Sequence, residues 1–160
     1  TPQPAITQAI IGVSDVPVFC GVGGGLTTGI RSASMAAYVE HQGAYGVVCN
    51  SKIGLETIRD IKSAVEIPVV YTVISEKMDI QPYLDAGVDI LNVSGAARTP
   101  EIVAALRARY PDMAIIATGG PKDETIRKTI AAGANAITYT PPDNGVLLAE
   151  IMHAHRERFR

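Results

Sequence analysis

Apolar and polar residues alternate along the chain in blocks that predict a repeated strand and helix. Six short apolar runs are rich in β-branched residues and end at turn residues, which is typical of buried parallel strands. The segments between these runs place apolar residues three and four positions apart, which predicts helices. The six predicted strands cover residues 16–20, 45–49, 67–73, 88–93, 113–118 and 135–140.

The residues at the ends of the predicted helices are types that favour the start or the end of a helix. Helices are predicted over 30–41, 55–65, 80–86, 101–110 and 124–132, with an opening helix over 5–11 and a closing helix over 146–159. Thr99 and Asp123 are predicted to cap the helices that begin one residue later. Three glycines are predicted to end helices in the left-handed conformation, namely Gly43, Gly87 and Gly133.

Alternating strands and helices predict an α/β fold with a parallel sheet and right-handed connections. A complete eight-stranded barrel usually needs ~250 residues, whereas this chain has 160. Polar residues two apart, such as Asn92 with Ser94, would share one face and line a polar mouth. We therefore expect one domain over 1–160 that forms a truncated or small TIM-like barrel of about six strands; an open doubly wound sheet is the alternative. Free sheet edges are commonly covered by a partner chain, so a homo-oligomer, most simply a dimer, is expected.

The amino-acid composition limits the classes of molecule that the chain is expected to bind. Hydrophobic residues make up 47% and charged residues 19%, with a formal net charge of -2, which indicates neither a disordered tail nor a nucleic-acid surface. The apolar runs are too short to span a bilayer, and the chain opens without the basic segment of a signal peptide. A cytoplasmic protein that acts on small molecules is expected. The two cysteines, Cys20 and Cys49, are expected to be inert core thiols.

Glycine-rich segments follow two of the predicted strands. Ligands of parallel α/β proteins bind beyond the carboxyl ends of the strands. In the segment GVGGGLTTG, Gly23, Gly24 and Gly25 could turn backbone N–H groups towards an anion. The pair Gly119-Gly120 before a helix offers a second candidate phosphate site, to which Thr140 could contribute from the last strand. The alternative for the first segment is a flexible loop without a ligand.

Candidate reactive groups also follow the strands. None of the six runs contains a lysine that could form a Schiff base inside the sheet. Lys77 and Glu76 could exchange a proton with an anionic substrate, or they could only screen each other. Asn92 is expected with Lys77 and Glu76 at the reacting end, and the alternative for it is a satisfied interior amide. Asn50 and Arg98 could hold polar groups of the substrate. No HxxxH or CxxC motif is present, so neither a metal nor a cofactor is expected.

Several segments resemble the ribulose-phosphate-binding barrel superfamily, and are most similar to the N-acetylmannosamine-6-phosphate 2-epimerases. They are SMAAYVEHQGAYGVVCNS, IRDIKSAVEIPVV, LDAGVDILNVSGAAR and IAAGANAITYT. The resemblance implies a TIM-type barrel. In that family a lysine ends the strand similar to 67–73, where Lys77 stands several residues later, and an acid lies where this chain has Asn92. Asn50 matches the family's asparagine after the second strand, and Arg98 approximates a following arginine.

These features favour an enzyme that acts on a small phosphorylated or carboxylated metabolite, as an isomerase or epimerase or as an aldolase-like carbon–carbon lyase. The reaction is expected at the carboxyl rim of the sheet. The alternative is a non-catalytic barrel relative that binds a metabolite or regulates a partner.

Overall fold

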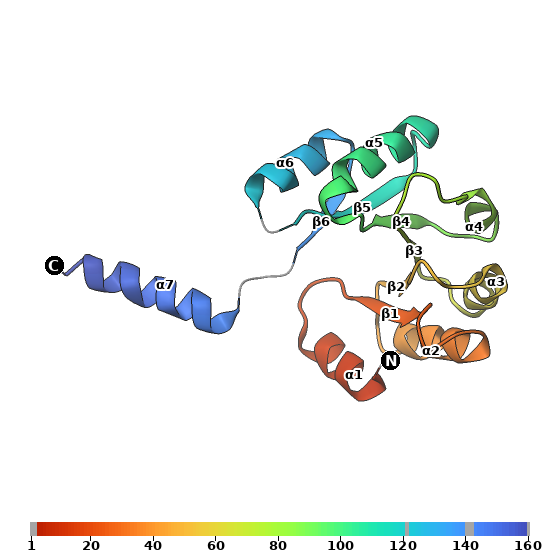
Figure 1. The fold of residues 1–160 in the computed structure, drawn as a ribbon. Helices are drawn as coiled ribbons and strands as arrows, with labels where there is room; N and C mark the ends of the chain where they lie inside the picture. Colours follow the sequence, from red (N-terminus) through yellow and green to blue (C-terminus); the bar gives the residue numbers. More distant parts are fainter. Residues whose placement is uncertain (1–2, 121, 140–142, 160) are drawn as a thin grey trace.

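The computed structural model describes residues 3–120, 122–139 and 143–159, and it contains six parallel strands that curl into a half-barrel (Figure 1). The strands pair in the order of the sequence, so each strand lies beside the next one along the chain. The prediction of a small TIM-like α/β fold is confirmed. The strands are β1 (Phe19–Gly23), β2 (Gly46–Cys49), β3 (Val69–Val73), β4 (Ile90–Val93), β5 (Ala114–Thr118) and β6 (Ala136–Thr138).

Helices separate the strands, and Figure 1 shows α2 to α6 along the outer side of the curled sheet. The helical segments are α1 (Pro4–Val13), α2 (Ile30–His41), α3 (Leu55–Ala64), α4 (Gln81–Asp85), the 3₁₀ turn η1 (Ala96–Arg98), α5 (Thr99–Arg109), α6 (Asp123–Ala131) and α7 (Asn144–Glu157). The helix α7 stands away from the rest of the molecule (Figure 1).

The predicted helix ends are confirmed at three glycines, but the predicted capping roles of Thr99 and Asp123 are wrong. Gly43, Gly87 and Gly133 have φ values of 96°, 103° and 107°, as a left-handed helix end requires. Thr99 and Asp123 are instead the first residues inside α5 and α6. The Thr99 hydroxyl accepts a hydrogen bond from the Gly95 N–H at 3.0 Å, so it fixes the preceding turn rather than the helix.

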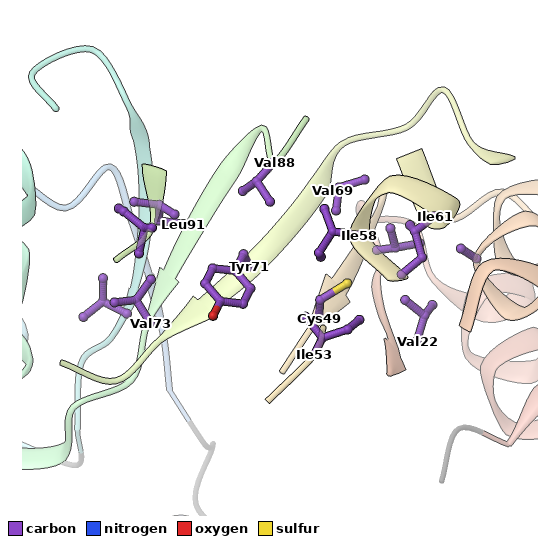
Figure 2. Packing of buried hydrophobic residues seen from close by; sticks show 14 of the residues in the cluster. Val22, Cys49, Ile53, Ile58, Ile61, Val69, Tyr71, Val73, Val88 and Leu91 are labelled. Carbon is purple, nitrogen blue, oxygen red and sulfur yellow. The ribbon is translucent and has the colours of Figure 1, made fainter. Parts of the chain in front are cut away.

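The hydrophobic core lies between the convex face of the sheet and the helices. Figure 2 shows Tyr71 and Leu91 pointing from their strands into this layer, with Ile58 and Ile61 of α3 among the surrounding side chains. Tyr71 is 1% exposed, stacks on Tyr83 at 4.2 Å between ring centroids, and donates to the Ser51 carbonyl. The burial of aliphatic side chains between a parallel sheet and its helices supplies most of the stabilisation of such a sheet.

The concave face of the sheet is open. Phe19 is 39% exposed there, and Val48 and Ile90 are only half-buried. A closed barrel would bury such inward side chains in layers. Six strands that end at β1 and β6 leave two free sheet edges and an accessible inner wall.

The amino end of the sheet is held by Arg107 of α5. Its guanidinium donates five hydrogen bonds, which go to the carbonyls of Gly133 (twice), Pro111 and Met113 and to Oδ1 of Asn135. An arginine has five N–H donors in a planar fork, so all of them are used. Arg107 therefore links the helix to the turns that enter β5 and β6.

Within the described residues, no helix combines the length and the apolar character needed to cross a bilayer.

Candidate functional site

Two cavities open near the carboxyl ends of the strands. The first, here called the Asn50 cavity, measures about 340 Å³ and lies between the glycine-rich loop after β1 and the ends of β2 and β3. The second, here called the Gly119 cavity, measures about 380 Å³ and lies between the segments after β4 and β5. The Asn50 cavity is lined by Gly21, Gly23, Gly25, Leu26, Thr27, Val48, Asn50 and Thr72. The Gly119 cavity is lined by Ala96, Ala97, Thr99, Pro100, Thr118, Gly119, Gly120, Lys122, Thr125 and Thr129.

The glycines of the first loop serve packing as well as access. A Cβ at Gly23 would overlap the buried Ser32 hydroxyl of α2, so glycine lets the helix approach the strand. Gly24 has φ 97°, and a Cβ there would lie 2.7 Å from the Asn50 carbonyl oxygen. The Gly24 N–H donates to the Thr27 carbonyl at 3.0 Å. Gly23 and Gly25 line the cavity. Gly24 closes the loop, and its N–H is already hydrogen-bonded within that loop.

A polar row crosses the inner wall beside the Asn50 cavity. Thr72 of β3 pairs with Asn92 of β4, and the Asn92 amide donates to the Thr72 hydroxyl at 3.3 Å. Asn50 follows β2, and its Oδ1 accepts from the Lys52 N–H and the Ser51 hydroxyl. These bonds turn the Asn50 amide oxygen towards its own loop. The amide nitrogen of Asn50 and the hydroxyls of Thr72 and Thr27 are the side-chain groups of the lining that suit a polar ligand.

The pair Gly119-Gly120 lines the second cavity for two different reasons. Gly119 is buried, and a Cβ there would press on Ile137 and Ile126. Gly120 has φ 72°, a conformation that favours glycine. The side chain of Lys122 is exposed and supplies positive charge at this cavity. Thr140 lies outside the described residues.

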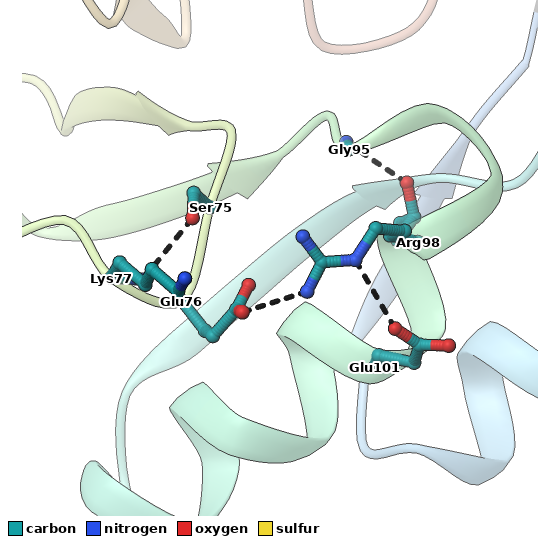
Figure 3. Close-up of polar contacts among 7 residues, drawn as sticks. Ser75, Glu76, Lys77, Gly95, Arg98 and Glu101 are labelled. Carbon is teal, nitrogen blue, oxygen red and sulfur yellow. Dashed lines mark hydrogen bonds and ion pairs between the residues drawn. The ribbon is translucent and has the colours of Figure 1, made fainter.

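Arg98 is engaged by two carboxylates, as Figure 3 shows. Its guanidinium donates to Oε1 of Glu76 at 2.7 Å and to Oε2 of Glu101 at 3.3 Å. The hydrogen bond from Arg98 is the main reason that the pKa of Glu76 lies below its usual value. The other oxygen of Glu76, Oε2, is inaccessible to water and has no hydrogen-bond partner within the described structure. Arg98 is therefore neutralised, and Glu76 is a weak proton acceptor.

Neither Glu76 nor Lys77 lines either of the two cavities. Lys77 lies beside Glu76 on the loop after β3, and its side chain is exposed (Figure 3). None of the residues within the six strands carries a charge. Charge at this end of the sheet thus comes from loops, where Lys52, Lys77 and Lys122 are exposed.

The described residues show neither a metal-binding cluster nor a reactive thiol. The described residues hold no group of three or more His, Cys, Asp or Glu side chains placed to bind a metal ion. Burial raises the pKa of Cys49 to about 12 and also raises that of Cys20. The two cysteines are therefore protonated core residues at neutral pH, as the sequence predicts.

Sequence reasoning gave no specific role to the hydroxyl of Thr72, and it missed Ser32. Thr72 sits in the apolar run 67–73, and its inward position follows from strand alternation, since its neighbours Tyr71 and Val73 face the core. Ser32 gave no such signal, because only the packing of α2 on β1 places it against Gly23.

Solved structures share this fold, although no protein-family model matches the chain and no curated protein matches it in sequence. A phosphonopyruvate hydrolase is similar with a TM-score of 0.70 and 17% identity, over 98% of this chain and 63% of that one. A 2,3-dimethylmalate lyase of the PEP mutase/isocitrate lyase superfamily gives 0.68 and 14%, over 96% and 64%. CdNal from Clostridium difficile, solved with mannosamine, gives 0.64 and 14%, over 85% and 51%.

The chain thus spans about half to two thirds of the length of these proteins. Identities below a quarter show the fold alone. The structures support a TIM-barrel type of fold, and they include lyase-type enzymes.

Proposed function

We propose that the chain binds a small phosphorylated or carboxylated metabolite at the carboxyl rim and acts on it as an isomerase, an epimerase or a carbon–carbon lyase. The observation that carries this proposal is the pair of cavities near one end of the sheet, one walled by neutral polar groups and one bordered by Lys122. The lyases among the similar structures support the same class of reaction.

The two cavities suit different parts of a ligand. The Asn50 cavity has no charged side chain in its lining, so a hydroxyl or carbonyl group fits it better than an ion. The Gly119 cavity has Lys122 in its lining and opens near the first turn of α6, where backbone N–H groups favour negative charge, although Asp123 and Glu124 also lie in that turn. The anionic end of the metabolite is therefore assigned to the Gly119 cavity.

Proton transfer is assigned to Lys77, whose exposed side chain lies outside both cavity linings and must move towards the Asn50 cavity for this role. In an isomerase or lyase of this kind, a base removes a proton from a carbon next to a carbonyl, and amide or hydroxyl donors stabilise the charge that develops on the oxygen. The Asn50 amide and the hydroxyls of Thr72 and Thr27 are the side-chain donors at the Asn50 cavity. Glu76 is assigned a positioning role, because its paired carboxylate holds Arg98 rather than a substrate proton.

A non-catalytic relative is the second candidate. The uncharged strands and the exposed position of Lys77, outside both cavity linings, favour this alternative. Such a protein would bind the same class of metabolite and release it unchanged.

The two candidates differ in what happens to a bound ligand. The first step is a thermal-shift panel of pyruvate, phosphoenolpyruvate, N-acetylmannosamine 6-phosphate and inorganic phosphate. Each compound that stabilises the protein is then incubated with it in deuterated water and followed by proton NMR. Entry of deuterium beside the carbonyl, lost in Lys77→Ala, supports the enzyme; stabilisation without exchange supports the binder. Failure of every anion to raise the melting temperature would contradict both.

Matched variants separate the two cavities. Thr72→Val removes one hydroxyl from the Asn50 cavity, whereas Thr138→Val removes one from β6, outside both cavity linings. Lys122→Met removes charge at the Gly119 cavity, whereas Arg127→Met removes it further along α6. We expect Thr72→Val and Lys122→Met to weaken binding by about 10-fold each, the effect of one lost polar contact, and the two controls to leave it unchanged.

A further inference from the structure

The helix α7 displays an apolar stripe that contacts nothing in the described chain. Leu147, Leu148, Ile151 and Met152 fall on one face by helical spacing, and Phe159 follows the helix. Figure 1 shows α7 standing clear of the body, and every side chain described in it is exposed. A helix of 14 residues is marginal in water without a packing partner. The stripe therefore needs a surface to cover it.

A second apolar stripe lies on α1. Ile6, Ile10 and Val13 are exposed on one face, while Ile11 on the other side packs against the core. The segment Pro4–Val13 contains no charged residue, so its outer face offers no favourable contact to ions or nucleic acid. It can pack against another apolar helix without burying a charge.

The two stripes adjoin opposite edges of the same sheet. The helix α1 precedes the edge strand β1, and α7 follows the edge strand β6. Free edges invite pairing unless something covers them. One contact that joined the two stripes would cover the apolar helices beside both edges at once.

We propose that two copies of this chain form a two-fold symmetric dimer in which α7 of each copy packs its apolar stripe on α1 of the other. The same contact then occurs twice, and no stripe is left open at the end of the assembly, as closed symmetry requires. Exchange of a terminal helix between identical chains is a common route to dimers.

The exposed area matches what such a dimer needs. The eight side chains of the two stripes are each between 38% and 87% exposed. Covering them completely removes at most about 850 Å² of surface per copy, close to the roughly 800 Å² per partner in a stable interface. Glu150 and His153 lie on the opposite face of α7 by helical spacing, so their charges and polar atoms stay in water.

Molar mass is the first test. Light scattering of the chain at about 100 μM, well above the micromolar dissociation constant that such an area supports, should give twice 16.9 kDa. Ile151→Asp should weaken the dimer by at least about 100-fold, because it buries an unpaired carboxylate in the contact. His153→Asp is the matched control and should dimerise as before. Since α7 does not touch the core, circular dichroism should show both variants folded.

Cross-linking tests the pairing of the helices. Single variants Ile10→Cys and Ile151→Cys are mixed and oxidised, and a covalent pair should form between the two different chains. Cys20 and Cys49 are buried and do not compete. His153→Cys in place of Ile151→Cys should give little product. A double variant that closes a disulfide within one chain would show that α7 folds back on its own α1 and would overturn the proposal. A wild-type mass of 16.9 kDa, or a dimer that survives Ile151→Asp, would overturn it as well.

Discussion

Nη2 of Arg98 donates to Oε1 of Glu76 across 2.7 Å, and this ion pair joins the loop after β3 to the turn before α5. The two residues are 22 positions apart, yet both follow neighbouring parallel strands, whose carboxyl ends meet at one rim. Two side chains that the sequence offers as candidate functional groups thus bind each other and hold the two loops together. The strength of this ion pair depends on the ionisation of Glu76, which makes it testable by pH.

We expect the stability gap between the wild type and Glu76→Gln to depend on pH. The hydrogen bond from Arg98 lowers the pKa of Glu76 in the folded state below the ordinary glutamate value of 4.5. A carboxyl with a lowered folded pKa contributes stability above the unfolded pKa and loses it as the pH falls through the folded value. The difference in free energy of unfolding between the wild type and Glu76→Gln should therefore be largest at pH 7 and become smaller below about pH 4.5. Urea unfolding at several pH values measures it, with Glu150→Gln as an exposed control. A gap that stays constant down to pH 2 would contradict the role of the pair.

Gly23→Ala should destabilise the fold more than Gly25→Ala. A Cβ at Gly23 meets the Ser32 hydroxyl and lies 2.9 Å from the Thr27 carbonyl oxygen, whereas a Cβ at Gly25 has nothing within 4 Å. Overpacking of this kind costs about 1–3 kcal/mol. Ser32→Gly should recover part of the loss in the double variant, because it removes one of the two obstructing groups. Equal melting temperatures for the two alanine variants would show that α2 can move away from β1 at no cost.

Tyr71→Phe should lower the free energy of unfolding by about 1 kcal/mol, the net value of one hydrogen bond. The ring and its stacking on Tyr83 remain, and only the bond from the hydroxyl to the Ser51 carbonyl is lost. Tyr71→Ala removes the ring as well and should cost about 3–5 kcal/mol. Chemical denaturation compares both with Tyr139→Phe, whose side chain is exposed and whose change should be neutral. Similar losses for Tyr71→Phe and Tyr71→Ala would argue against the packing role of the ring.

Alkaline pH should destabilise the protein partly through Cys49. Burial raises the pKa of this thiol from 9.0 to about 12. A group whose folded pKa is raised stabilises the fold below its unfolded pKa, and this stability is lost as the pH rises through the folded value. The free energy of unfolding should fall from about pH 9 upward, and the fall should be smaller in Cys49→Ala. The same burial predicts that a thiol reagent modifies Cys49 only after denaturant is added. Rapid labelling in the native state would show that the β2 end opens.

Much of the fold could be predicted from the sequence, because strand and helix periods and helix-ending glycines are local signals. The runs ending at Val73 and Val93 mark strands closely, whereas β1 begins at Phe19 and continues into the glycines, where no side chain shows a strand pattern. The loops that form the candidate site follow from parallel topology. What each side chain does there depends on contacts between distant segments, such as Arg98 with Glu76, and spacing along the chain carries no signal for those.

Arg107 uses all of its donors at the end of the sheet that faces away from the cavities. The residues whose groups it binds line neither the Asn50 cavity nor the Gly119 cavity. Changes in the loops of the opposite rim therefore leave this anchor in place, which makes those loops the natural place to exchange or lengthen when the proposed binding is tested or altered.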